Sequence, residues 1–115
     1  MNPSWTWAAG SAISTAEDLR IWAKAFATGQ LISPAMQRER LTWVPIAEGA
    51  GYGLGIFRVG DLIGHNGEIP GFQSFMVYSP KRDVTIIVLT TLDEAPAGTA
   101  PADDLARIII TALAR

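Results

Sequence analysis

The segment Val84–Leu89 constrains the fold more than any other feature of this sequence. It reads Val-Thr-Ile-Ile-Val-Leu, which is apolar almost without alternation. A strand with one face in water alternates apolar and polar side chains, so an unbroken apolar run is typical of a strand covered on both faces. We therefore expect a layered domain in which this strand lies deep in a sheet.

Other strands are predicted on the N-terminal side of this segment. From residue 52 the apolar residues recur with a period of two, which indicates a strand over Tyr52–Phe57. Gly60-Asp61 fits a two-residue hairpin whose first position needs a positive φ, so Leu62–Asn66 should return antiparallel. Phe72–Ser79 and Val84–Thr91 form a second predicted hairpin. The expected sheet is an antiparallel meander of four strands.

Two helices are predicted before the sheet. The run Ser14-Thr15-Ala16-Glu17 is typical of a capping box, with Ser14 as the cap, and it predicts a helix over Thr15–Thr28 that Gly29 ends. Ser33-Pro34 is a second start signal, a cap followed by proline at the first helical position. It predicts a shorter helix that ends within Thr42–Pro45, because proline cannot continue a helix.

A third helix is predicted at the C-terminal end of the chain. Asp103 and Asp104 lie near its start, where the helix dipole favours negative charge. Five residues share one stripe, which we expect to dock on the sheet: Leu105, Ile108, Ile109, Ala112 and Leu113. Together these elements predict one α+β domain over residues 1–115, with N-terminal helices and a C-terminal helix packed on the sheet.

Composition limits the classes of function. The nine Lys and Arg residues are scattered and the net charge is −2, so no nucleic acid and no anionic membrane surface is expected as a partner. The chain has no cysteine and one histidine, so we expect no disulfide, metal site or other cofactor. No apolar run approaches the ~20 residues of a membrane span. The four tryptophans are expected in the core and at its rim, and Asp61 and Asp83 are expected to be solvated turn residues.

The glycine-rich segment Gly64–Phe72 is the best candidate for chemistry. Three glycines and a proline lie within its nine positions, which lets a ligand approach the backbone closely. His65 lies in this opening, and an imidazole titrates nearest neutral pH, so it could carry a proton or bind an anion. The alternative is an ordinary histidine at the end of a strand, which the local spacing alone favours.

The segment His65–Phe72, followed by Tyr78-Ser79-Pro80 and Val84–Thr91, resembles the third conserved element of class C β-lactamases and D-alanyl-D-alanine carboxypeptidases. Ala9–Leu19 and Tyr52–Gly55 resemble other parts of these penicillin-binding-protein-like serine hydrolases. In that family a Lys-Thr-Gly or His-x-Gly triplet lies on an edge strand beside the catalytic serine. The resemblance implies a partial β-lactamase/transpeptidase-like fold, and a parent protein that is secreted or held in the cell envelope.

The resemblance assigns roles to four residues. His65 matches the Lys or His of the triplet, Asn66 its hydroxyl residue and Gly67 its glycine, while Glu68 matches the residue whose backbone N–H serves the oxyanion hole. Asn66 departs from the pattern, because a Thr or Ser there would donate a hydroxyl to a substrate carboxylate. Esters and amides are therefore as plausible substrates as β-lactams or D-Ala-D-Ala peptides.

Two family motifs are absent from the chain. None of its six serines is followed by a lysine three positions on, so the nucleophile motif Ser-x-x-Lys is missing, and so is Tyr-x-Asn. We expect this chain to be the C-terminal part of a larger serine hydrolase domain, inactive alone, whose partner is the N-terminal half of the parent enzyme. The alternative is a non-catalytic binding or self-association module derived from that family.

An oligomer is also expected from the resemblance. In the family the strand that matches Val84–Thr91 is interior and pairs with a strand from the N-terminal segment. Without that partner, Val84–Leu89 would leave an open apolar edge, so we expect a homo-oligomer formed through this edge.

Overall fold

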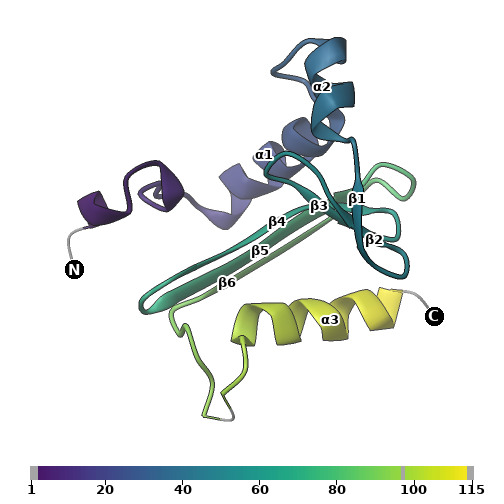
Figure 1. Cartoon of the computed structure of the whole chain (residues 1–115). Helices are drawn as coiled ribbons and strands as arrows, with labels where there is room; N and C mark the ends of the chain where they lie inside the picture. Colours follow the sequence, from purple (N-terminus) through teal and green to yellow (C-terminus); the bar gives the residue numbers. More distant parts are fainter. Residues whose placement is uncertain (1–2, 97, 114–115) are drawn as a thin grey trace.

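A six-stranded antiparallel sheet forms the centre of the computed structural model, which describes residues 3–96 and 98–113 (Figure 1). The strands lie side by side in chain order, and each is antiparallel to the next. They are β1 (Val44–Ala47), β2 (Ala50–Tyr52), β3 (Phe57–Val59), β4 (Leu62–Ile69), β5 (Phe72–Ser79) and β6 (Val84–Thr90). The predicted α+β meander is confirmed, with six strands where four were expected.

The two additional strands have separate origins. The predicted strand Tyr52–Phe57 is divided into β2 and β3, because the chain turns between them and the N–H of Gly53 donates to the carbonyl of Ile56 at 2.7 Å. β1 occupies the segment where Pro45 was expected only to end a helix. It lies at the edge of the sheet, where a proline without an N–H is tolerated.

The hairpin of β4 and β5 is longer than predicted. The two strands pair residue by residue from Ile63 opposite Tyr78 to Ile69 opposite Phe72, and only Pro70 and Gly71 connect them. Residues 67–69 of the glycine-rich segment therefore belong to a strand, whereas the predicted strand ended at Asn66. The turn before β4 is as predicted, with Gly60 at φ 60° in its first position.

The described residues form four helical segments beside the sheet: η1 (Pro3–Ala9, a 3-10 helix), α1 (Ala16–Thr28), α2 (Pro34–Arg40) and α3 (Pro101–Leu113). The cap of α1 is Thr15 rather than Ser14, since the Thr15 hydroxyl accepts from the N–H of Asp18 at 3.1 Å. Glu17 pairs with Arg20 at 2.6 Å, one turn into the helix, so no capping box forms. Gly29 ends α1 in the left-handed conformation and Ser33 caps α2, both as predicted.

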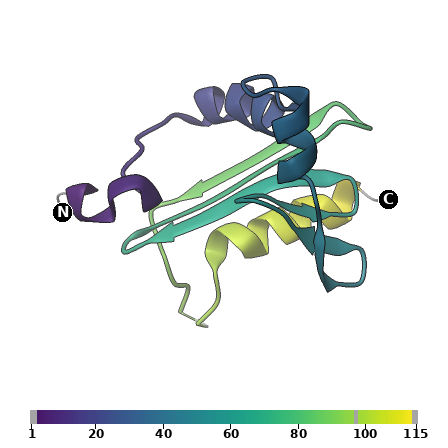
Figure 2. The same cartoon turned by 45° about the horizontal axis from the view of Figure 1, so that its top comes forward.

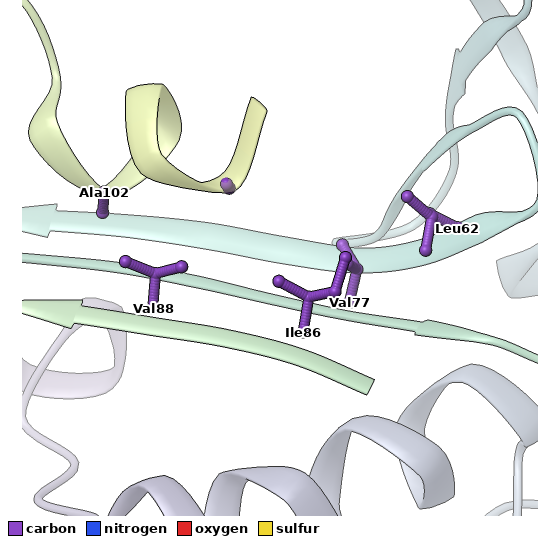
Figure 3. Packing of buried hydrophobic residues seen from close by; sticks show 6 residues of the cluster. Leu62, Val77, Ile86, Val88 and Ala102 are labelled. Atoms are coloured by element: carbon purple, nitrogen blue, oxygen red, sulfur yellow. The ribbon is translucent and has the colours of Figure 1, made fainter. Parts of the chain in front are cut away.

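Helices cover both faces of the sheet (Figures 1 and 2). On the face toward α3, a buried cluster comprises Leu62, Val77, Ile86, Val88, Ala102 and Ala106 (Figure 3). On the face toward α1, a second cluster comprises Ala23, Ala27, Met76 and Tyr78, with Ile87 packed against it. β6 thus buries Ile86 and Val88 on one side and packs Ile87 on the other, which confirms that its apolar run is covered on both faces.

β6 lies at the edge of the described sheet, so the expectation from its apolar run of a strand deep within the sheet is wrong, whereas the open edge expected from the family resemblance is present. Among the described residues it pairs with β5 alone. The unbroken apolar sequence of β6 indicates that other elements pack on both faces of the sheet at this strand. It carries no information on whether a strand lies beside it, because side chains and backbone hydrogen bonds point in perpendicular directions.

α3 packs on the sheet, but not through the predicted stripe. Ala102 and Ala106 are fully buried, and Ile110 packs against their cluster. These three residues follow one another at intervals of about one helical turn. The predicted stripe faces outward, with Ile108 67% and Leu105 48% exposed. The small alanine side chains let α3 lie close to β5 and β6. The face of α3 that contacts the sheet is therefore not the one that apolar periodicity predicts. No helix among the described residues has the length and hydropathy to span a membrane.

Several side chains differ from their expected environments. Trp5, Trp7 and Trp22 are exposed, so these tryptophans do not form the core. Asp61 accepts hydrogen bonds from the Ser79 hydroxyl and the Arg82 guanidinium, which together lower its pKa. Ser79 is the last residue of β5 and Arg82 lies in the turn that follows. The two bonds of Asp61 therefore link the turn before β4 to the end of β5.

Asp83 is an exposed turn residue, as expected, and it also has two side-chain partners. It accepts from Lys24 and from the Tyr78 hydroxyl, each at 2.8 Å, and these two bonds, the one from Lys24 first, lower its pKa. The contact ties the turn between β5 and β6 to α1. The two turn aspartates thereby fix the C-terminal end of β5 to neighbouring elements, at Tyr78 and at the fully buried Ser79.

We propose that the chain self-associates through the free edge of β6, most simply as a two-fold dimer. Unpaired N–H and C=O groups along an apolar strand recruit another strand, and no proline or charged residue interrupts Val84–Thr90. Light scattering over a dilution series should show a mass above that of the monomer at high micromolar concentration. Leu89→Lys, at a position 46% exposed, should weaken the association several-fold by placing a charge on the apolar edge strand.

Leu54→Lys provides the matched control, because Leu54 is 65% exposed in the loop between β2 and β3. It should leave the association unchanged. A monomer at all concentrations, with rapidly exchanging amides in Val84–Leu89, would show that the edge stays open.

Candidate functional site

The four residues singled out in the sequence lie together along one hollow of about 420 Å³. Four elements contribute to its lining, which consists of Ala9 from η1, His65, Asn66, Gly67 and Glu68 from β4, Gln73 from β5 and Asp103 from α3. The hollow therefore forms where the first part of the chain, the central hairpin and the C-terminal helix meet.

The backbone of β4 has an open edge beside these residues. Its pairing with β3 ends at Gly64, which lies opposite Phe57, whereas its pairing with β5 continues to Ile69. From His65 onward, no strand among those described lies on the other side of β4. Backbone groups on that edge can therefore meet a ligand, as the oxyanion role expected of the Glu68 N–H requires.

His65 is held at both ring nitrogens. Its Nε2 lies 2.5 Å from the Tyr52 hydroxyl, and its Nδ1 hydrogen-bonds to the carbonyl oxygen of Asn66. The ring also meets Tyr52 edge-on at 5.7 Å and Phe57 at 5.9 Å between centroids. These contacts fix the orientation of the ring. A histidine exposed to solvent without such partners would have no fixed orientation.

Sequence reasoning missed Tyr52 as a neighbour of His65. A signal did exist in the register, because Tyr52 pairs with Phe57 and Phe57 pairs with Gly64, the residue before His65. That signal becomes readable only when the predicted strand Tyr52–Phe57 is recognised as two strands.

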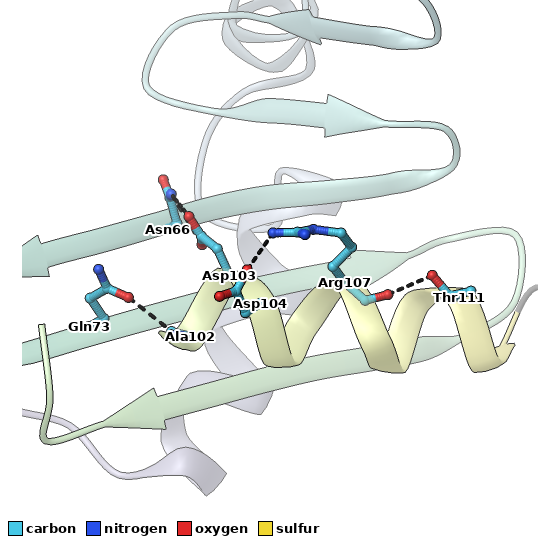
Figure 4. A network of polar contacts seen from close by, with 7 residues as sticks. All are labelled: Asn66, Gln73, Ala102, Asp103, Asp104, Arg107 and Thr111. Atoms are coloured by element: carbon cyan, nitrogen blue, oxygen red, sulfur yellow. Dashed lines mark hydrogen bonds and ion pairs between the residues drawn. The ribbon is translucent and has the colours of Figure 1, made fainter. Parts of the chain in front are cut away.

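Asn66 and Glu68 face the side of the sheet that carries α3. The Asn66 amide donates to both carboxylate oxygens of Asp103, at 3.2 and 3.4 Å (Figure 4). Glu68 accepts from the Gln73 amide at 3.2 Å. The hollow is thus lined by two carboxylates and one imidazole, with no lysine or arginine. Asp103 appeared in the sequence only as a charge near a helix start.

Gln73 connects the site to the rest of the fold. It is buried, and its amide nitrogen donates to the carbonyl of Asp93 at 2.7 Å. Its amide oxygen accepts from the N–H of Ala102 at 3.2 Å, the bond drawn in Figure 4. The second bond satisfies one of the free N–H groups in the first turn of α3. Gln73 thereby places Asp103, one residue further along that turn, next to Asn66.

The turn at the far end of the hairpin is held as well. The Gly71 N–H donates to the Asp93 carboxylate at 2.8 Å, and this bond lowers the pKa of that carboxyl.

Among the described residues, no group of three or more His, Cys, Asp or Glu side chains could hold a metal ion.

Comparison with known proteins defines the class. The beta-lactamase family model matches residues 1–110, so the chain belongs to the beta-lactamase family. The family resemblance seen in the sequence is confirmed.

A crystal structure of a D-stereospecific amidohydrolase from Streptomyces sp. is similar, with a TM-score of 0.61 and 26% identity. The match covers 70% of this chain and 26% of that one, so this serine-hydrolase-related chain matches about a quarter of the length of the amidohydrolase.

The site glycines should differ sharply in their tolerance of a side chain. A Cβ on Gly64 would lie 1.9 Å from the backbone oxygen of Met76, which cannot move without breaking the β4–β5 pairing. A Cβ on Gly67 would meet only the Ser74 hydroxyl, at 2.7 Å, and that side chain can rotate away. We expect Gly64→Ala to lower the free energy of unfolding by about 3 kcal/mol or more, and Gly67→Ala to lower it much less.

Urea unfolding of the two variants measures this difference directly. Equal losses would show that the strands do not approach each other at Gly64 as closely as the structure describes.

Proposed function

We propose that this chain is the C-terminal part of a larger serine hydrolase domain and supplies one wall of its acyl-transfer site. The observation that carries the proposal is the hollow lined by His65, Asn66, Gly67 and Glu68, beside an open strand edge. The N-terminal half of the parent enzyme would supply the nucleophile, because no serine of this chain lies in a Ser-x-x-Lys motif.

In this role β4 contributes both a backbone donor and a side chain. When a nucleophile attacks a carbonyl carbon, negative charge develops on the carbonyl oxygen, and a fixed N–H donor there contributes about 3 kcal/mol to the transition state. The Glu68 N–H takes this part. His65 lies three residues before it on the same strand and takes up or returns a proton.

The substrate is best described as an amide or ester without a carboxylate next to the reacting bond. Asn66 stands where the family has a hydroxyl residue, and its amide nitrogen is already directed at Asp103. Asp103 and Glu68 make the hollow acidic, which disfavours an anionic substrate. The name of the similar amidohydrolase is consistent with amide hydrolysis.

A non-catalytic module for binding or self-association is the second candidate. The free edge of β6 and the exposed apolar stripe of α3 favour it. The two candidates make different predictions for a longer protein that includes this chain, because only the hydrolase requires His65.

The isolated chain should not hydrolyse a p-nitrophenyl ester or a chromogenic β-lactam, since removal of a serine nucleophile costs about a million-fold in rate in such enzymes. In the parent protein, which contains the upstream segment, ester hydrolysis should appear. There His65→Ala should lower kcat by about 100-fold or more if His65 transfers a proton. Steady-state kinetics measures the change.

Gln30→Ala is the control for that series, because Gln30 is exposed in the connection between α1 and α2, away from the hollow. It should retain full activity. A parent protein that is active and indifferent to His65→Ala would return this histidine to a structural role.

Asn66→Thr in the parent protein should favour substrates that carry a carboxylate over neutral esters. The change restores a hydroxyl donor and releases the amide contact with Asp103. The ratio of kcat/KM for a carboxylate-bearing and a neutral ester measures the effect, and Asn66→Ala separates gain of the hydroxyl from loss of the amide. An equal change for both substrates would contradict the role given to this position.

A further inference from the structure

We propose that Tyr52 is a positioning residue that holds the His65 imidazole in one tautomer, with the proton on Nδ1 and the lone pair on Nε2. The inference rests on the two hydrogen bonds of the ring. Its use in catalysis rests on the proposed function, whereas the tautomer itself does not.

The tautomer follows from the chemistry of the partners. A backbone carbonyl can only accept a hydrogen bond, so Nδ1, which contacts the carbonyl oxygen of Asn66, must carry the proton. In the neutral ring Nε2 then has a lone pair, and the Tyr52 hydroxyl, 2.5 Å away, donates to it. Tyr52 thus supplies the one donor that the neutral ring needs.

The same pair also suits the protonated ring. When Nε2 takes up a proton, it becomes a donor, and the Tyr52 hydroxyl can turn and accept from it while it retains its own proton. The contact therefore survives the change of charge, so the ring keeps its place while it takes up and returns a proton. A partner that only donates, such as lysine, would repel the protonated ring.

Tyr52 is itself well supported. It ends β2, and the two residues after it are tied down: Gly53 N–H donates to the carbonyl of Ile56 at 2.7 Å, and Leu54 N–H to the carbonyl of Arg40 at 3.0 Å. A Cβ on Gly53 would lie 2.1 Å from that Arg40 oxygen, so the loop approaches the end of α2 closely. This support lets Tyr52 hold the imidazole rather than follow it.

The sequence makes the test unusually clean, because His65 is the only histidine and the chain has only two tyrosines. In the isolated chain, labelled with ¹⁵N-histidine and kept at an alkaline pH at which the ring is neutral, long-range ¹H–¹⁵N spectra report the state of each ring nitrogen. We expect a protonated-type shift for Nδ1 and an unprotonated-type shift for Nε2. In Tyr52→Phe the two shifts should move toward each other as the second tautomer becomes populated.

Tyr78→Phe is the matched control. It removes the other tyrosine hydroxyl, which donates to Asp83 at 2.8 Å on the far turn of the sheet, and it should leave both ring shifts unchanged. Wild-type spectra with the proton on Nε2, or Tyr52→Phe spectra identical to wild type, would overturn the proposal. The wild-type measurement decides the tautomer even if Tyr52→Phe does not fold.

Kinetics of the parent protein separates this inference from the proposed function. Tyr52→Phe should lower kcat by about 10- to 100-fold with little change in KM, by analogy with the loss of a hydrogen-bond partner from a metal-bound histidine. A parent protein without hydrolase activity would end the proposed function but leave the spectroscopic result standing. If the activity depends on His65 but the spectra place the proton on Nε2, the role proposed for Tyr52 is wrong and the proposed function stands.

Discussion

The pairing of β4 with β5 is the interaction on which the rest of the structure depends. It runs without a break from Ile63 opposite Tyr78 to Ile69 opposite Phe72. One strand of this hairpin carries the candidate site, and the other carries both the core residue Val77 and the buried Gln73. Gly64 has no side chain, which permits the close approach of the two strands. A glycine is therefore required here by the strand pairing, whether or not a ligand binds.

Polar contacts then join the hairpin to its surroundings. Gln73 binds the first turn of α3, which sets the position of Asp103 against Asn66. The same anchor helps to determine the rotation of α3, in which alanines face the sheet and larger aliphatic residues face outward. The electrostatic character of the hollow and the packing of the C-terminal helix therefore have a common origin in one buried amide.

The structure presents more open apolar surface than a small domain usually does. β6 has a strand on one side only, and the outer face of α3 exposes Leu105, Ile108 and Leu113. The chain matches about a quarter of the length of the similar amidohydrolase. Both facts agree with a segment whose fold is complete enough to arrange a site and whose surfaces suit further protein contacts.

The sequence by itself determined the features that neighbouring residues control. These are the Gly29 and Ser33 helix ends, the Gly60-Asp61 turn and the two-sided cover of β6. Only the tertiary structure decided the extent of β4, the buried face of α3, the edge position of β6, and the partners of His65 and Asn66. Each of these depends on the register between strands or on contacts between segments far apart in the chain, which local periodicity and turn chemistry do not encode.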